Sequence, residues 1–140
     1  MSAIERVEQL LRRIHEGADT LRAAETEGLA RVAQDPLRWA GVERLAQITI
    51  QACVDLSDWV LAAEGIEEPP RARDVFSALA SAGLLDPDLA RTLEDLVGLR
   101  NTLAHEYLTV TVGDLSARIP EIVQAAEAFA DAMVLVLPSA

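Results

Sequence analysis

Hydrophobic residues recur along most of the chain at steps of three and four, the spacing that places them on one face of an α-helix. The first run predicts a helix from about Ile4 to Val32. Polar and breaker residues at 34–36 interrupt it, and we expect Asp35 to cap the next helix with Pro36 in its first turn. The predicted apolar face of the first helix consists of Ile4, Val7, Leu11, Ile14, Ala18 and Leu21.

The second predicted helix, from about Pro36 to Ala63, is apolar on two sides. One set contains Leu45, Ile48, Ala52, Leu56, Trp59 and Ala63, and the other contains Val42, Ala46, Ile50, Cys53 and Val54. A helix that is apolar on more than one side is usually buried on more than one side. In a chain this short a second copy can supply that additional surface, which predicts a homodimer. The polar strip between the two sets consists of Arg44, Gln47, Gln51, Asp55 and Asp58.

Glycine and proline residues indicate the element boundaries in the next part of the chain. The breakers from Gly65 to Pro70 predict a loop, and a short helix is expected from about Ala72 to Ala82. Asp86 followed by Pro87 is a cap and a first-turn proline, so a fourth helix should run from Pro87 to about Glu106. The short helix should bury Val75, Phe76 and Leu79, and the fourth helix Leu89, Leu96, Leu99 and Leu103.

The segment 108–112 favours extended backbone but has no second strand to pair with, so we interpret it as a connection. Asp114 is expected to cap a short turn, after which a last helix should reach about Leu137, with Pro120 either kinking it or beginning its main part. The buried positions expected in it are Ile122, Ala126, Phe129, Met133 and Leu137. The sequence therefore predicts one all-α domain over 1–140, an antiparallel bundle of four main helices plus one short helix.

The composition predicts a folded helical domain and argues against a membrane-spanning or secreted protein. Hydrophobic residues make up 51% of the 140 positions, and no stretch approaches the roughly 18 apolar residues that a membrane span needs. The charged start lacks an apolar signal segment, and one cysteine, Cys53, can form neither an internal disulfide nor a metal cluster. We expect a cytoplasmic protein that needs no metal and no cofactor.

The formal net charge of −11 comes from 12 basic and 23 acidic residues. Proteins that bind nucleic acid broadly carry a basic surface, so this balance argues against that class. Any activity on RNA must rest on a local positive site, or on a dimer that brings its few arginines together.

The polar residues near the end of the fourth helix form the strongest candidate site. At about 100° per residue, Asn101 and His105 share one edge of the helix, while Arg100 and Tyr107 share the other if the helix stays regular that far. Ala104 lies between these edges and leaves a gap. Histidine can transfer protons near neutral pH, arginine can bind phosphate, and asparagine can orient either one. Spacing alone leaves a second interpretation open, because cations also favour a helix C-terminus electrostatically.

The run Arg100-Asn101-Thr102-Leu103-Ala104-His105-Glu106-Tyr107 closely resembles the signature of HepT-like toxins in the HEPN superfamily: Arg, four residues, His, any residue, Tyr. The layout of long helices, proline-containing loop, short helix and motif helix is also similar to that family. The resemblance covers nearly the whole chain. It implies a HEPN-like bundle that dimerises with its motif helices near the seam, and a metal-independent endoribonuclease that stops growth.

The resemblance also implies roles for individual residues. Arg100, His105 and Asn101 would be catalytic, with His105 as general acid and base, Arg100 on phosphate and Asn101 orienting. The implied partner is a minimal nucleotidyltransferase antitoxin that transfers AMP from ATP onto Tyr107 and silences the toxin. The alternative hypothesis is a non-enzymatic helical dimer whose polar face binds a nucleotide or the nucleotidyltransferase, and the acidic charge favours it.

Other chemistry-bearing residues have simpler interpretations. His15, among charged neighbours on the first helix, is expected to be solvated, and Cys53 to be a small buried residue. Trp59 is expected in the core, whereas Trp39 fits a core or an interface equally well. The polar strip of the second helix could be an exposed ridge, but we favour a dimer seam because the flanking faces are both apolar. An acidic residue there could orient a catalytic group.

Overall fold

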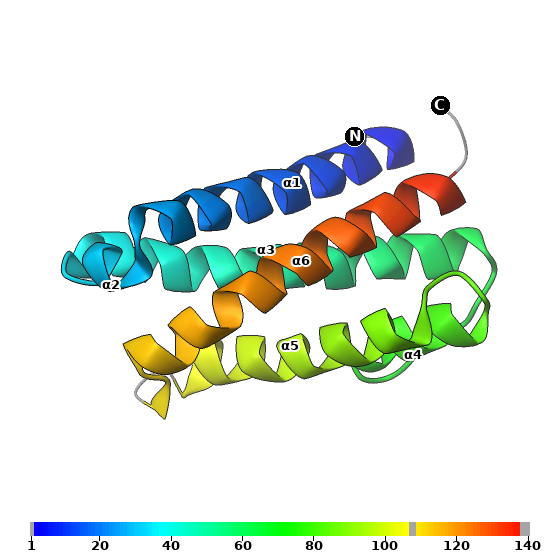
Figure 1. Ribbon diagram of the computed structural model, residues 1–140. Coiled ribbons are helices and arrows are strands. Elements are labelled where there is room, and N and C mark those ends of the chain that lie inside the picture. The colour runs from blue at the N-terminus through cyan, green and yellow to red at the C-terminus, as the bar shows by residue number, and fades with distance from the viewer. Residues whose placement is uncertain (1, 107–108, 138–140) are drawn as a thin grey trace.

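Four long helices run alternately in opposite directions along one bundle (Figure 1). The computed structural model describes residues 2–106 and 109–137, and within these ranges the regular elements are all helical. They are α1 (Ala3–Glu27), α2 (Leu29–Val32), α3 (Pro36–Ala63), α4 (Asp74–Ser81), α5 (Pro87–His105) and α6 (Val112–Val136). The predicted bundle of four main helices and one short helix is confirmed, with one further turn of helix in α2.

The first helix ends earlier than its hydrophobic pattern predicts. Gly28 has a φ of 110°, a backbone conformation that residues with a side chain rarely adopt, and it divides the predicted helix into α1 and α2. The helix begins at a capping box, in which Ser2 and Glu5 each bond to the other's backbone N–H. The pattern missed the break because Leu29 and Val32 continue the apolar spacing beyond it.

The helix starts that rest on an aspartate followed by proline are confirmed. Asp35 accepts hydrogen bonds from the backbone N–H groups of Leu37 and Arg38 at the start of α3. Asp86 accepts one from Leu89 at the start of α5. Proline in the first helical turn loses no hydrogen bond, because those N–H groups have no intrahelical acceptor.

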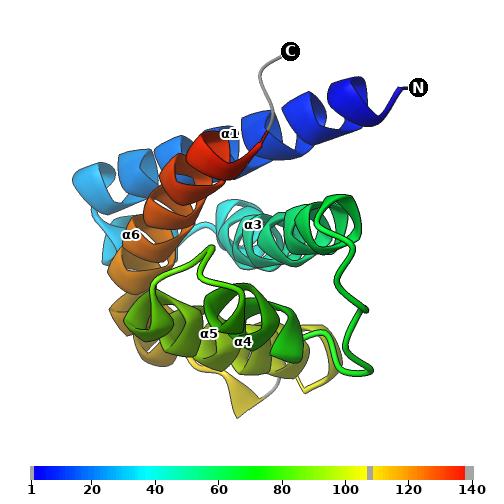
Figure 2. The ribbon, with the colours of Figure 1, turned by 90° about the vertical axis from the view of Figure 1, so that its right-hand side faces the viewer.

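The central helix α3 is covered on most sides by the rest of the same chain. It packs against α1, α4, α5 and α6, and Figure 2 shows it between α1 and α6 on one side and α4 and α5 on the other. Residues of both predicted apolar sets are buried, including Leu56 and Ile50. The chain itself therefore supplies the second burial surface that we assigned to another copy, so this burial gives no support to a dimer.

The two tryptophans of α3 have different environments. Trp39 is 8% exposed and belongs to the core, whereas Trp59 is 38% exposed. The expectation that Trp59 is a core residue is therefore wrong. The predicted burial of Val75, Phe76 and Leu79 on α4 is confirmed, and the rings of Phe76 and Phe129 meet edge to face with centroids 5.7 Å apart.

A close approach between α1 and α3 fixes how these two helices cross. A Cβ placed on Gly17 would lie 2.0 Å from the hydroxyl oxygen of Thr49. Both residues are buried, and the Thr49 hydroxyl donates a hydrogen bond to the carbonyl oxygen of Leu45 at 2.8 Å. Only glycine lets the two backbones come this close.

The last helix begins one residue after Thr111, which caps it. Thr111 and Asp114 form a capping box, so Asp114 acts from the first turn rather than as the cap itself. Pro120 lies inside α6, and Ile122, Ala126, Phe129 and Met133 are buried as expected. In the part of the chain that the structure describes, no helix has the length and apolar character that crossing a bilayer requires.

Candidate functional site

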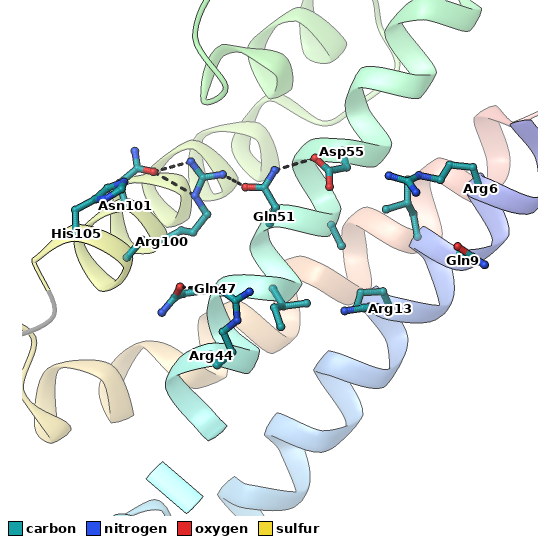
Figure 3. Close-up of a pocket in the computed structure, with 14 residues that line it drawn as sticks. Arg6, Gln9, Arg13, Arg44, Gln47, Gln51, Asp55, Arg100, Asn101 and His105 are labelled. Carbon is teal, nitrogen blue, oxygen red and sulfur yellow. Dashed lines mark hydrogen bonds between the residues drawn. The ribbon is translucent and has the colours of Figure 1, made fainter. Parts of the chain in front are cut away.

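An open groove of about 540 Å³ follows the polar strip of α3 (Figure 3). Helix α1 forms one wall and the end of α5 forms the other, so residues from three distant parts of the sequence face a common space. Its polar lining consists of Arg6, Gln9, Arg13, Arg44, Gln47, Gln51, Asp55, Arg100, Asn101 and His105, and its apolar lining of Leu10, Ile48, Ala52 and Ala104.

A chain of hydrogen bonds holds Arg100 in this groove. Its Nε and Nη2 donate to the Oδ1 of Asn101, at 3.2 Å and 2.5 Å, and its Nη1 donates to the Oε1 of Gln51. The Nε2 of Gln51 in turn donates to Asp55 at 2.8 Å. The carboxylate therefore sets which way the Gln51 amide faces, because only the amide nitrogen can donate to it.

The Arg100 guanidinium is partly withdrawn from water. Burial lowers its pKa from the ordinary value, while the negative charge of Asp55 acts in the opposite direction. A partly desolvated cation interacts more strongly with an incoming anion than a fully hydrated one does. This arrangement suits binding of a phosphate.

The predicted residues of the motif helix reach the same groove. Asn101 and His105, four residues apart on α5, both line it (Figure 3). Ala104 lines it as well. Helix α5 ends at His105, with Glu106 as its C-cap. Tyr107 lies outside the described residues.

Four arginines line the groove, and none of them forms an ion pair within the described residues. All 12 basic residues of the chain are arginines, and five of them form ion pairs elsewhere: Arg22, Arg38, Arg71, Arg91 and Arg118. Within the described ranges, the four groove arginines have no carboxylate within 4 Å, and Asp55 is the one acidic residue of the lining. The groove is therefore a positive region on a protein of net charge −11.

Sequence reasoning missed the wall that α1 contributes. Arg6 and Arg13 lie seven residues apart, hence on one face of α1, and point toward the polar strip of α3 (Figure 3). That spacing was a usable signal, but a pattern along one helix does not indicate that this face of α1 lies opposite the motif helix. The strip itself proved to be the floor of a groove, rather than a plain exposed ridge.

The remaining singled-out residues lie away from the groove. His15 is exposed on α1, as expected. Cys53 is fully buried, and burial raises the pKa of its thiol far above the ordinary value. A buried neutral thiol is a poor nucleophile.

The groove brings together the groups that phosphodiester chemistry uses. An exposed imidazole that can exchange protons stands at the end of α5, next to an amide and a guanidinium held in place by hydrogen bonds. Three further guanidinium groups extend the positive surface along α3 and α1. Such a site can bind an extended polyanion and transfer a proton at one point along it.

Sequence comparison relates the chain to one family and to two nucleases that match part of it. The model of a family described as ribonuclease HepT-like matches residues 2–133. The mRNA nuclease HepT of Shewanella oneidensis is 33% identical over 57 residues, 41% of this chain and 43% of that protein. The tRNA nuclease HepT of Aphanizomenon flos-aquae is 35% identical over 65 residues, 46% of this chain and 44% of that protein. The matched segments thus span less than half of either curated relative.

The fold is shared over nearly the full length. A solved structure described as tri-AMPylated Shewanella oneidensis HEPN toxin in complex with MNT antitoxin matches with a TM-score of 0.84. The match has 21% sequence identity and covers 96% of this chain and 99% of that chain. The predicted HEPN-like architecture is confirmed.

Proposed function

The chain belongs to the HepT-like ribonuclease family, and from this premise we propose that it is an RNA-cleaving toxin of a toxin–antitoxin pair. Two proteins that resemble part of it are named as nucleases of mRNA and tRNA. The reaction we propose is cleavage within an RNA strand without a metal ion, in the cytoplasm, by one helical domain.

The observation that carries the proposal is the convergence of Arg100, Asn101 and His105 on one wall of the arginine-lined groove. The net charge of −11 argued against RNA as a ligand, and the groove removes that objection because its charge is locally positive. Positive charge is also favoured at a helix C-terminus for electrostatic reasons alone. That explanation would not account for the bond from Arg100 to Gln51 or for the arginines of α1 in the same groove.

The proposed chemistry uses the side chains of this site for positioning and proton transfer. His105 accepts the proton of a ribose 2′-hydroxyl, and the resulting oxygen attacks the adjacent phosphorus. The bond to the 5′-oxygen breaks as that oxygen takes up a proton, which leaves a 2′,3′-cyclic phosphate and a 5′-hydroxyl. Arg100 stabilises the charge that builds on the phosphate oxygens, and Asn101 holds the guanidinium in place.

A homodimer and an antitoxin complete the proposal. Because each chain brings one histidine to the site, a twofold pair would supply a second imidazole for the second proton transfer. A related structure is described as an AMPylated HEPN toxin in complex with MNT antitoxin. We assign the corresponding modification here to Tyr107, two residues after His105 in the sequence, because an added phosphate is negative and would compete with RNA for the groove arginines.

The test compares the two histidines of the chain. His105→Ala is expected to abolish cleavage of total RNA and growth arrest, whereas His15→Ala, at an exposed position on α1, should behave like the parent protein. Purified protein from each variant is incubated with RNA in the presence of a chelator, and products are resolved by gel electrophoresis. Cleavage by His105→Ala at the parental rate would remove the catalytic assignment.

The alternative hypothesis predicts a different result in the same assay. A non-enzymatic dimer would bind ATP or the nucleotidyltransferase but leave every RNA intact, with the parent protein and both histidine variants indistinguishable. Intact mass of the protein, with and without the co-expressed nucleotidyltransferase, then tests whether Tyr107 gains AMP.

A further inference from the structure

We propose that Arg6, Arg13 and Arg44 form a track that binds the backbone phosphates of single-stranded RNA on one side of the cleaved bond. The inference rests on the proposed ribonuclease function and names how its substrate is held. The residues of this arginine track lie outside the Arg–His motif, and two of them come from α1, the opposite end of the sequence.

The first argument is that three cations lie around one groove without forming an ion pair in the described structure. Five other arginines form ion pairs, some of which link two helices, such as Arg38 with Glu27 and Arg118 with Asp95, while Arg12, Arg31 and Arg73 form none among the described residues and lie outside the groove. Within the described ranges the track arginines form none, and Arg44 contacts only the amide oxygen of Gln47, at 3.5 Å. Unpaired like charges around one groove repel one another, so a bound anion would stabilise the arrangement.

The second argument is continuity with the reacting groups. Arg44, Gln47 and Gln51 follow one another along the same face of α3, and Gln51 bonds directly to Arg100. Arg6 and Arg13 face this row from α1, about 10 Å apart along the helix axis at 1.5 Å per residue. A strand whose phosphate lies at Arg100 can therefore continue along the groove from one cation to the next.

The lining also indicates the form of RNA. Double-stranded RNA is recognised over long surfaces that reach about 16 base pairs, whereas this positive region is one groove on an acidic protein. Among the described residues the lining contains no aromatic ring on which bases could stack, and Leu10, Ile48, Ala52 and Ala104 form its apolar part. We therefore infer that the track itself contacts phosphates, because its three side chains are guanidinium groups, whose geometry suits phosphate.

Charge disfavours the other obvious occupant of the track, the same track of a second copy. A twofold contact that closed the track would bring its three arginines against the same three of the partner, whereas the proposed dimer needs only the His105 ends of the two grooves to meet. Like charges facing each other cost free energy in an interface. An extended anion meets no such opposition.

The experiment measures binding rather than cleavage. The probe is a fluorescent 2′-O-methyl RNA oligonucleotide, which lacks the attacking hydroxyl, and anisotropy gives Kd over a series of salt concentrations. The triple variant Arg6→Gln/Arg13→Gln/Arg44→Gln should bind about 100-fold more weakly, and its slope of log K against log salt should fall by about 2. The triple lysine variant should keep most of the affinity, since charge is what the phosphates require.

Arg12→Gln is the matched control, because Arg12 adjoins Arg13 on α1 but does not line the groove. It should bind as the parent protein does. If the triple glutamine variant matches Arg12→Gln while the parent cleaves RNA, the track is wrong and the ribonuclease function stands. If the parent binds the probe through the track but cleaves no RNA, the ribonuclease function fails instead. Normal RNA binding with loss of a protein partner would assign the groove to that partner and overturn the inference.

Discussion

The guanidinium of Arg100 donates a hydrogen bond to the side-chain oxygen of Gln51, which lies 49 residues earlier in the chain. This contact joins the motif helix α5 to the central helix α3 at the groove. Asp55 bonds to the other end of the Gln51 amide and so keeps its oxygen turned toward Arg100. The relationship makes Gln51 a positioning residue, since it acts through the arginine.

Removing this support should weaken catalysis while the fold remains intact. Gln51→Ala is expected to lower kcat for RNA cleavage about 10-fold, because a hydrogen bond to a charged group is worth roughly 1.5–3 kcal/mol. Thermal unfolding should change little, as Gln51 is only half-buried. The control is Gln124→Ala at an exposed position of α6. If Gln51→Ala combined with Arg100→Ala lowers activity by the full product of the two single effects, the two side chains act independently and the role is wrong.

The close approach at Gly17 gives a prediction about stability. Gly17→Ala should destabilise the protein by about 1–3 kcal/mol, since its Cβ would overlap the Thr49 hydroxyl and force α1 from α3. Gly41→Ala, on α3 with open space around it, should instead stabilise by about 0.5–1 kcal/mol. Denaturant unfolding measures both. Adding Thr49→Ala to Gly17→Ala should recover part of the loss, and simple additivity would contradict the proposed clash.

The elements that local signals specify were predictable. Asp35 and Asp86, each followed by proline, placed the starts of α3 and α5 correctly because capping depends on neighbours in sequence. The end of α1 was not predictable from apolar spacing, because Gly28 acts through its backbone conformation.

The site also contains some features that were predictable from the sequence and others that were not. The motif residues Arg100, Asn101 and His105 could be placed on one helical face, because four-residue spacing fixes that geometry. The contribution of Arg6 and the bond from Arg100 to Gln51 depend on which faces of α1, α3 and α5 meet. That is set by packing over distances of 49 residues and more, which a pattern along one helix does not contain.

Asp58 gives a pH-dependent prediction. Its pKa is raised from 3.8 to about 6, first by burial and then by Glu68 and Asp55, and its Oδ1 is buried with no hydrogen-bond partner in the described structure. The folded protein then binds a proton that the unfolded chain releases, so this carboxyl destabilises the fold as pH rises from about 4 through 6. Asp58→Asn should raise stability at pH 7 by about 1 kcal/mol, reduced for solvent exposure, and change nothing at pH 3.5. Calorimetry at both values checks this, and an equal gain at each pH would contradict it.

Replacement by lysine should have a larger effect at Arg100 than at Arg44. The Nε, Nη1 and Nη2 of Arg100 all donate hydrogen bonds within the site, and a lysine ammonium cannot reproduce that planar fork. Arg100→Lys should therefore lower kcat/KM for RNA cleavage about 100-fold although the charge is kept. Arg44 makes one weak contact and is proposed to act by charge, so Arg44→Lys should lower kcat/KM only about twofold. Initial rates at several salt concentrations separate the cases, because the loss at Arg100 should persist in low salt, where charge attraction is strongest. Equal losses at both positions would mean that Arg100 serves only as a charge, and the oriented site argued from its hydrogen bonds would be wrong.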